Sequence, residues 1–372
     1  MQAMKNGLAQ PACDRIIQTF ALITEFDQQK FETLALDGIE TLELKDRVAQ
    51  FIGALNQCLP ADFCQAAEIL MQVPDVWHRF SAHYQQTPHP MFAAWPIIDY
   101  ASIYGLEYPE ISLNLLKRLT PLFSAEFAIR PFIQQHQSLC FEYFSAWVKD
   151  EDEHVRRLVS EGTRPLLPWG IRLTEFVKDP IPNIHLLTAL KADPSLYVRR
   201  SVANHLNDIA KHNADLVMAI CADWHQTADV NTQWLIKHAC RGLIKSGHTQ
   251  AFKLLGFTEN PAVELTQLKL DKQKISFGES VNFNFEITSL TDYSQHIVVD
   301  YKLYFMRANG KQNGKVFKLK NIKLAPNESS VLNKAHSFKP VTTRKYYPGI
   351  HKIEVLVNGK IRQMAEFELL PD

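Results

Sequence analysis

The sequence predicts a mainly α-helical protein in which a solenoid of stacked helix pairs is followed by a β-sandwich. Three observations predict this fold class. Apolar residues recur at helical spacing up to about Pro261, similar helix starts repeat at periods of 43 and 36 residues, and apolar and polar residues alternate after Pro261. At 372 residues the chain exceeds one ordinary core, so we expect two domains, residues 1–261 and 262–372.

The first part of the chain is predicted to be all-helical. Three clear amphipathic runs cover Leu44–Leu59, Ile111–Phe123 and Ile181–Ala192. Turns are expected where proline follows aspartate, at Asp179-Pro180 and Asp193-Pro194, because such pairs interrupt helical hydrogen bonding.

The later helices repeat a motif. Val-Arg-Arg at Val155 recurs at Val198, 43 residues on, and a third helix pair aligns at Trp234, 36 residues further. These periods are close to those of HEAT-type helix pairs, about 40 to 47 residues. In this alignment Glu161, Asn204 and Cys240 are equivalent. Stacked pairs of this kind present a concave surface suited to a long ligand.

Seven alternating runs after Pro261 predict strands. Between them stand turn signals such as Asn309-Gly310, Asn313-Gly314 and Asn358-Gly359. Seven short strands in about 110 residues indicate an immunoglobulin-like sandwich without a disulfide. The runs are 263–270, 279–289, 296–306, 315–324, 330–338, 349–357 and 360–370.

Composition limits the function classes. Formal net charge is zero, yet Ala262–Asp372 holds 17 Lys and Arg against 11 Asp and Glu, so the tail is basic. The sequence has no apolar run of about 18 residues and no leader-like start, so we expect a cytoplasmic protein outside the membrane. The six dispersed cysteines form no CxxC pair and predict free thiols rather than a metal site.

Glu161 is a candidate catalytic carboxylate. It precedes Gly162, where backbone admits close approach of a ligand, and a loop limited by Pro165 and Pro168 follows. A carboxylate there suits an oxocarbenium-like sugar in glycosidic cleavage. The alternative is an ordinary surface ion pair with Arg164.

Trp169 is the second candidate because it stands in this loop rather than on a helical stripe. Its indole face suits a cationic base or a sugar. The alternative is an aromatic plug that closes the top of a repeat.

The paired arginines suit successive phosphates. We expect one arginine of each pair to be structural and the other to face the ligand, with the track continued by nearby helices and by a basic hairpin in the tail. A solvated surface is the alternative for the hairpin. The predicted DNA-binding residues are Arg156, Arg157, Arg164, Arg199, Arg200, Asn204, Lys237, Lys315 and Lys318. The acidic cluster Asp150–Glu153 is interpreted as a helix cap rather than a metal site.

Two long motifs carry a resemblance to a known family. SAEFAIRPFI (Ser124–Ile133) and RRLVSEGTRPLLPWG (Arg156–Gly170) closely resemble the HEAT-like-repeat DNA alkylation-repair glycosylases, in the AlkC branch, over nearly the whole chain. The family's functional carboxylates match Glu126 and Glu161, and its active-site tryptophan matches Trp169. Leu166 departs from the pattern, because many members have arginine there.

The resemblance implies a monofunctional glycosylase of base excision repair that needs neither metal nor cofactor. Its substrate would be double-stranded DNA carrying cationic alkylated bases, chiefly 3-methyladenine, attacked by a monomer without deep base flipping. Two alternatives from other classes remain at this point: a noncatalytic HEAT adaptor and a branched-DNA-binding protein without activity.

Overall fold

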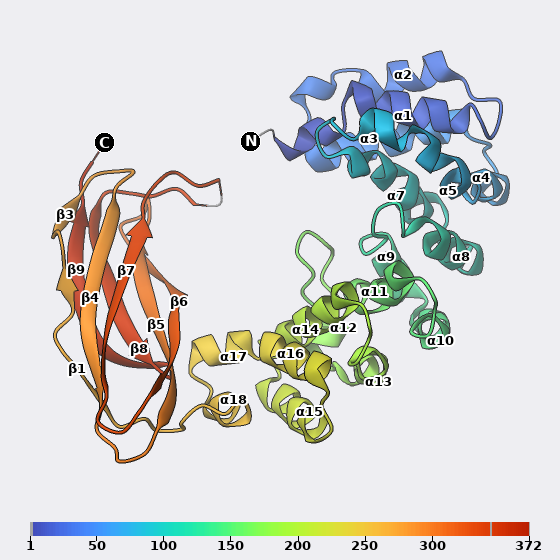
Figure 1. Ribbon diagram of the computed structural model, residues 1–372. Coiled ribbons are helices and arrows are strands. Elements are labelled where there is room, and N and C mark those ends of the chain that lie inside the picture. The colour runs from blue at the N-terminus through green and yellow to red at the C-terminus, as the bar shows by residue number, and fades with distance from the viewer. Residues whose placement is uncertain (1–2, 343, 372) are drawn as a thin grey trace. The chain divides into compact units, whose positions relative to one another are not determined.

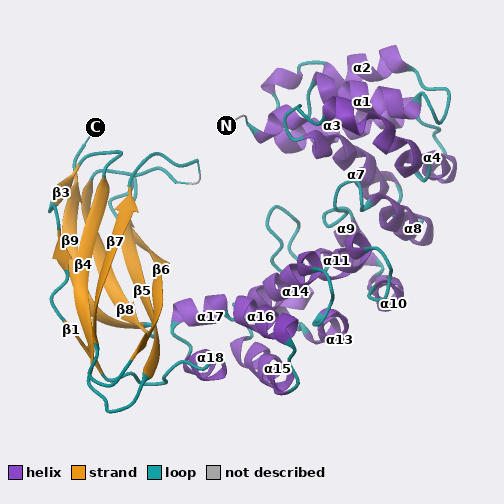
Figure 2. Ribbon diagram, in the orientation of Figure 1, coloured by secondary structure: helices purple, strands orange, loops and turns teal. Residues whose placement is uncertain are grey.

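The computed structural model describes residues 3–342 and 344–371, and it confirms the predicted fold class. Helices occupy the chain as far as Leu254, and strands occupy it from Val263 onward (Figure 2). The predicted helical runs at 44–59, 111–123 and 181–192 are observed as α3, α8 and α13, which end one to four residues earlier than expected.

The first helices follow one another as stacked pairs, which Figure 1 traces from blue to yellow-green. They are α1 (Gln10–Phe20), α2 (Gln28–Leu36), α3 (Leu44–Cys58), α4 (Phe63–Leu70), α5 (Val73–Trp77), α6 (Ser81–Tyr84), α7 (Trp95–Tyr104), α8 (Pro109–Leu119), α9 (Ile129–Gln135), α10 (Gln137–Trp147), α11 (Glu153–Gly162), α12 (Thr174–Lys178), α13 (Ile181–Leu190) and α14 (Leu196–Ile209). Four further helices follow: α15 (Ala214–Gln226), α16 (Val230–Ala239), α17 (Arg241–Ser246) and α18 (Thr249–Leu254).

Side-chain caps set the start of both helices that carry the Val-Arg-Arg motif. Asp152 accepts a hydrogen bond from the main-chain N–H of His154, and Ser195 accepts one from Tyr197. These caps satisfy backbone donors that the first helical turn leaves free. The interpretation of the acidic cluster as a helix cap is therefore confirmed, and Val155 and Val198 enter the core at matching positions of α11 and α14.

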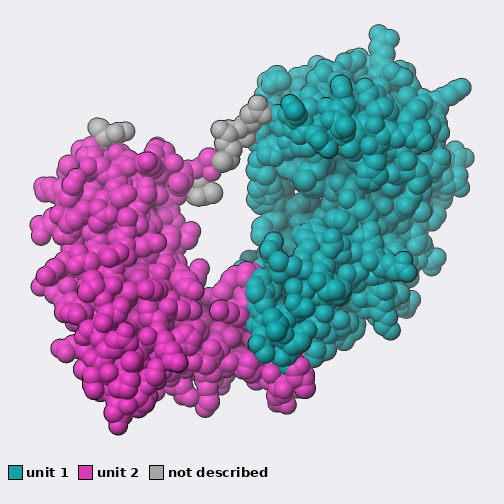
Figure 3. Space-filling view, viewed as in Figure 1, with its two compact units in different colours: residues 1–212, 228–235 teal, residues 213–227, 236–372 magenta. Residues whose placement is uncertain are grey.

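The chain divides into two compact units (Figure 3). Unit 1 comprises residues 1–212 and 228–235, and unit 2 comprises 213–227 and 236–372. Unit 2 therefore contains α15, α17, α18 and the end of α16 together with the strands. The predicted domain boundary at residue 261 stays a prediction.

The sandwich consists of two sheets that face each other across an apolar core (Figure 1). One sheet has the order β1-β4-β2, with β7 also paired to β4, and the other has the order β3-β9-β8-β5-β6. The strands are β1 (Val263–Leu265), β2 (Lys269–Leu270), β3 (Lys274–Ile275), β4 (Ser280–Ser289), β5 (Gln295–Met306), β6 (Gln312–Leu324), β7 (Ser329–Ser337), β8 (Gly349–Val357) and β9 (Lys360–Leu369).

Two of the predicted strand features are wrong, and the short strand β3 was not predicted. The run 263–270 forms two short strands, because both β1 and β2 pair with β4 but not continuously. Asn313-Gly314 is not a turn, since both residues lie inside β6 and pair with β5. The turn predicted at Asn309-Gly310 is confirmed, and the positive φ of 74° at Gly310 suits a tight turn.

Within the described part of the chain, every helix is too short or too polar to cross a lipid bilayer. All six cysteines are free thiols.

Candidate active site

Glu161 lies at the end of α11, where this helix packs against α14, and its residue is only 5% exposed. The Ser201 hydroxyl of α14 donates a hydrogen bond of 2.5 Å to Oε2, and Arg164 donates one of 2.5 Å to Oε1. The carboxylate is therefore held in one orientation by two elements. Its burial makes the interpretation as a surface ion pair wrong, although the pair with Arg164 exists.

Arg157 joins the two predicted carboxylates. Its guanidinium lies one turn before Glu161, donates to Glu126 Oε2 at 2.8 Å, and approaches Glu161 Oε1 at 3.6 Å. The same group lies over the Tyr197 ring, 4.5 Å from its centroid. Burial by itself lowers the pKa of Arg157, but the charges of Glu161 and Glu126 outweigh it, so that the net shift is upward and the guanidinium stays charged. The site thus holds a cation between two carboxylates and an aromatic face.

Arg164 extends this network inward. It donates to Asp208 Oδ2 at 2.8 Å while it also binds Glu161, and both it and Asp208 are buried. Burial lowers the pKa of Arg164, and the Glu161 and Asp208 charges raise it more, which gives a net upward shift. Arg164 is therefore an internal support of the Glu161 carboxylate, and its predicted contact with DNA stays a prediction.

Trp169 stands in the loop that follows α11. Its backbone adopts a left-handed conformation with φ of 68°, unusual for a bulky residue, and the residue is 54% exposed. The fully buried Arg130 fixes both ends of this loop, because it donates to the carbonyl of Gly162 at 2.7 Å and to that of Ile171 at 2.6 Å. An exposed indole on an anchored loop contradicts the alternative of a buried plug.

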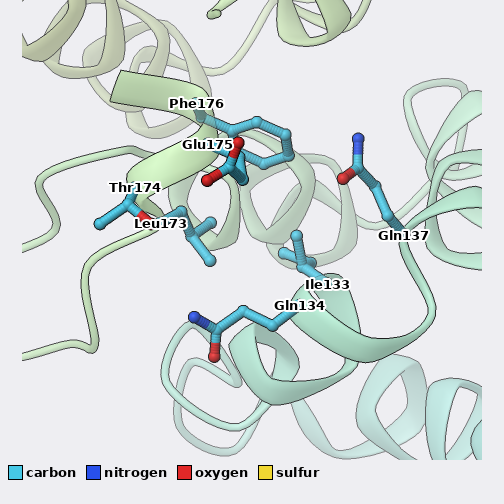
Figure 4. Close-up of a pocket in the computed structure, with 7 residues that line it drawn as sticks. All are labelled: Ile133, Gln134, Gln137, Leu173, Thr174, Glu175 and Phe176. Atoms are coloured by element: carbon cyan, nitrogen blue, oxygen red, sulfur yellow. The ribbon is translucent and has the colours of Figure 1, made fainter. Parts of the chain in front are cut away.

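A hollow of about 320 Å³ opens beside Glu126. It is lined by Glu126, Arg157, Tyr197 and His154, together with residues of the turn before Glu126. A second hollow, between α9 and α12, contains none of the predicted site residues and no cationic side chain (Figure 4). It is lined by Ile133, Gln134, Gln137, Leu173, Thr174, Glu175 and Phe176.

The first arginine of each Val-Arg-Arg motif makes internal contacts. Arg156 pairs with Asp193 at 2.6 Å, and Arg199 donates to the carbonyls of Asp193 and Pro194, so both are occupied internally. Arg157 faces the carboxylates, and Arg200 is exposed on α14. The predicted DNA contacts of all four stay predictions.

Four predicted DNA-binding residues remain, and they lie on three different elements. Asn204 is half-buried on α14, and Lys237 is exposed on α16. Lys315 and Lys318 are exposed on β6 in unit 2. The structure therefore brings together Glu126, Arg157, Glu161 and Arg164, and Arg130 ties the Trp169 loop to the end of α11.

Sequence reasoning missed Ser201, Asp208, Tyr197, Arg130 and Lys45. Ser201 and Asp208 belong to the repeated helix, where the period aligns backbone positions but does not tell which side chain turns inward. Lys45 donates to the carbonyl of Trp169 across 124 positions, a relationship without any local signal. Tyr197 directly precedes Val198, and its adjacency to the motif was the only available sign.

The described residues contain no group of three or more His, Cys, Asp or Glu side chains arranged to hold a metal ion. The side chains that meet at the candidate site are the carboxylates of Glu126 and Glu161, the Arg157 guanidinium and the Tyr197 ring.

Comparison with known proteins gives three findings. A family model described as the C-terminal Ig-like domain of uncharacterised protein YhaZ matches residues 264–371. Uncharacterized protein YhaZ of Bacillus subtilis (strain 168) is 36% identical over 346 residues, which cover 93% of each chain. The solved structure of Pseudomonas fluorescens alkylpurine DNA glycosylase AlkC, bound to DNA containing an abasic site analog, matches with a TM-score of 0.92 and 34% identity over 100% of both chains. The likeness extends through helices and sandwich alike.

Proposed function

This chain belongs to the family of the alkylpurine DNA glycosylase AlkC, and on that premise we propose that it hydrolyses the N-glycosidic bond of cationic alkylated bases in double-stranded DNA. The chief substrate is 3-methyladenine, and the reaction opens base excision repair. The protein acts as a monomer in the cytoplasm, without a metal or cofactor.

The observation that carries this proposal is a cation held between Glu126 and Glu161. The Arg157 guanidinium occupies that place, with Tyr197 beneath it. Two carboxylates and an aromatic face are the groups that stabilise positive charge in a site of low polarity. The same groups favour the positive charge that develops on deoxyribose as the glycosidic bond breaks.

The leaving group needs little assistance. A base alkylated at nitrogen carries a formal positive charge, so it departs with the bonding electrons as a neutral molecule and needs no general acid. The sugar then carries the positive charge. Water adds to C1′ and gives up a proton, leaving a neutral free base and an abasic site. The protein therefore supplies charge stabilisation and a positioned water.

We assign the two carboxylates different roles. Glu161 already receives hydrogen bonds from Ser201 and Arg164, so it acts as a fixed negative charge. Among the residues the structure describes, only Arg157 donates to Glu126, at Oε2, which leaves Oε1 for a water. Glu126 is also the more exposed side chain, at 16% against 7%. Glu126 therefore positions the water and takes its proton.

Trp169 contacts the lesion deoxyribose. An indole that is 54% exposed on an anchored loop offers a flat face to a sugar without enclosing a base. The hollow beside Glu126 is open to the surface rather than an enclosed chamber. Selectivity then arises from the charge and lability of the lesion itself and not from a deep pocket for a flipped base.

The experiment is release of free 3-methyladenine from methylated duplex DNA under single-turnover conditions. We expect wild type to release the base and Glu161→Gln to do so about 100- to 1000-fold more slowly, because one preorganised charge is lost. Glu175→Gln is the matched control, since Glu175 is 73% exposed and pairs only with Lys178 on α12. Its rate should equal that of wild type.

A folded wild-type protein that binds DNA and releases no base would overturn the proposal in favour of a noncatalytic DNA-binding role. Equal rates in wild type, Glu161→Gln and Glu126→Gln would be consistent with glycosylase activity. They would contradict the catalytic roles assigned to these two glutamates.

A further inference from the structure

A second cationic site lies in unit 2, where the last helices meet the edge of the five-stranded sheet. A cavity of about 120 Å³ opens between α16–α17 and β5–β6. Its polar lining comes from Lys237, Arg241 and Lys245 on the helices and from Asp300, Lys318 and Asn321 on the strands. Since a water molecule takes about 30 Å³ in the liquid, the cavity has room for a larger polar group.

The walls of this cavity are fixed to each other by packing. Phe252 and Phe257 at the end of the helical part form one buried cluster with Val298 of β5. Asn358 adds a polar connection, because its amide donates to the carbonyl of Thr258 at 2.6 Å and its oxygen accepts from the Val298 N–H at 2.8 Å. The helical and strand residues therefore face each other in a preformed arrangement.

The strand wall has a specific geometry. The β5–β6 ladder shifts register between Val299 and Asp300, so that Asp300 lies opposite Lys318 rather than opposite Leu319. Opposed residues in a ladder point to the same face of a sheet, and such bulges commonly re-aim side chains beside functional sites. The irregularity thus sets Lys318 beside Asp300 at the cavity.

Positive charge dominates the cavity. Asp300 is its single acidic residue among those that line it, and it is 4% exposed. Burial raises the pKa of Asp300 to about 6, against the lowering effect of Lys245 and Lys318. Within the described part of the chain, neither these two lysines nor Lys237 forms an ion pair with a carboxylate. Three ammonium groups and a guanidinium thus surround one carboxylate.

Asn321, which lines the cavity, has one unsatisfied polar atom. Its side-chain oxygen is buried and has no hydrogen-bond partner among the described residues. Native proteins seldom leave such an atom unsatisfied. Because the amide oxygen and nitrogen exchange places by rotation, the same side chain offers an N–H donor to an anion in the cavity.

We propose that this cavity binds a phosphate group of the DNA backbone, with Lys237 and Lys318 as the principal ligands from its two walls. The inference rests on the proposed function for the identity of the polyanion. It assigns unit 2 a defined phosphate contact, distinct from the carboxylate site in unit 1. Asp300 sets the strength of the contact, because its negative charge opposes that of the phosphate.

The test is equilibrium binding of undamaged duplex DNA over a range of salt concentrations. We expect Lys237→Gln/Lys318→Gln to bind on the order of tenfold more weakly than wild type, and the slope of log affinity against log salt to fall by about one unit. Lys320→Gln is the single-charge control, since Lys320 is exposed on the same strand outside the cavity. Its slope should stay within a few tenths of the wild-type value.

A second variant removes a negative charge instead of a positive one. It tests whether the cations of the cavity bind phosphate or only neutralise Asp300. Asp300→Asn keeps the size of the side chain and removes the opposing charge, so it should bind DNA about fivefold more tightly than wild type. If the cations served only to neutralise Asp300, this variant would not tighten binding, and that result would overturn the proposal.

Two further results are decisive. Wild-type affinity and salt slope in Lys237→Gln/Lys318→Gln, or an equal loss in Lys320→Gln, would overturn the phosphate site. Single-turnover release of 3-methyladenine at saturating protein should be unchanged in Lys320→Gln, because Lys320 lines neither this cavity nor the hollow beside Glu126. If wild type binds DNA without releasing base, the glycosylase proposal fails. The slopes of log affinity against log salt still test the phosphate site in that case.

Discussion

Lys45 on α3 donates a hydrogen bond of 2.7 Å to the main-chain carbonyl of Trp169. The bond reaches from the first helices to the loop after α11. It holds a residue whose backbone is in the left-handed region, where a non-glycine residue persists only if its surroundings fix it. Lys45 is thus a positioning residue for the exposed indole.

Lys45→Met should slow base release about fivefold, because one net hydrogen bond of about 1 kcal/mol that holds Trp169 is lost. The measurement is the single-turnover rate together with the affinity for DNA. Lys30→Met is a matched control, since Lys30 also donates to a carbonyl, that of Gln57, away from the site. An equal slowing in both variants would contradict a specific role.

Arg164→Gln should lower the free energy of unfolding by about 3 to 5 kcal/mol. The substitution leaves the buried carboxylates of Glu161 and Asp208 without their shared cation, and breaking a buried pair by removing one partner costs about this much. Denaturant unfolding measures the loss. Arg118→Gln removes an exposed pair with Asp75 and should cost no more than about 1 kcal/mol. Similar losses in both variants would contradict the prediction.

The free energy of unfolding should fall as the pH falls, because His205 is buried in the neutral form. Burial is the main cause that lowers the pKa of His205 to about 3, and Arg164 and Arg130 lower it further, against a hydrogen bond to the Ser160 carbonyl. Between about pH 6.5 and pH 3 His205 is protonated in the unfolded chain and neutral in the native protein. The free energy of unfolding therefore falls as pH falls, by up to about 1.4 kcal/mol per unit from this group.

The comparison of wild type with His205→Asn isolates this contribution. Asparagine retains a donor for the Ser160 carbonyl and has no titration in this range. We expect the difference in unfolding free energy between the two proteins to change steadily from pH 6.5 to pH 4. A constant difference across that range would exclude His205 as the titrating group.

Gly162→Ala should destabilise the protein by about 1 to 3 kcal/mol. A Cβ at Gly162 would lie 2.6 Å from Ile129 Cγ2, which is overpacking at the contact between α11 and α9. Gly53→Ala on α3 is the control, since its Cβ would meet nothing within 4 Å and alanine favours a helix. Gly162→Ala/Ile129→Ala should lose less than the sum of its single variants, and an additive result would reject the clash.

The sequence allowed the repeated helices and most strands to be predicted because their signals are periodic. Val155 and Val198 occupy matching core positions, as their shared motif indicated. β3 escaped prediction because two residues, Lys274 and Ile275, are too few to show alternation, and its parallel pairing with β9 comes from residues nearly 100 positions away.

The candidate site was predictable only in part. Glu161 and Trp169 were recognised by their unusual places beside a glycine and in a proline-limited loop, and Glu126 only through a family resemblance. Neither Ser201 nor Asp208 was recognised, because inter-helix packing and not spacing decides that their side chains meet Glu161 and Arg164.

Phe252 lies in α18 and Phe257 in the connector that follows it, and both pack with the sandwich, since Val298 of β5 completes their cluster. A shortened protein that ends at Pro261 would expose the side of this cluster that Val298 covers and is expected to self-associate. Lost DNA binding by such a fragment would therefore report damaged folding as much as a missing contact. Single substitutions in the intact chain therefore distinguish the contribution of the helices to DNA binding from that of the sandwich.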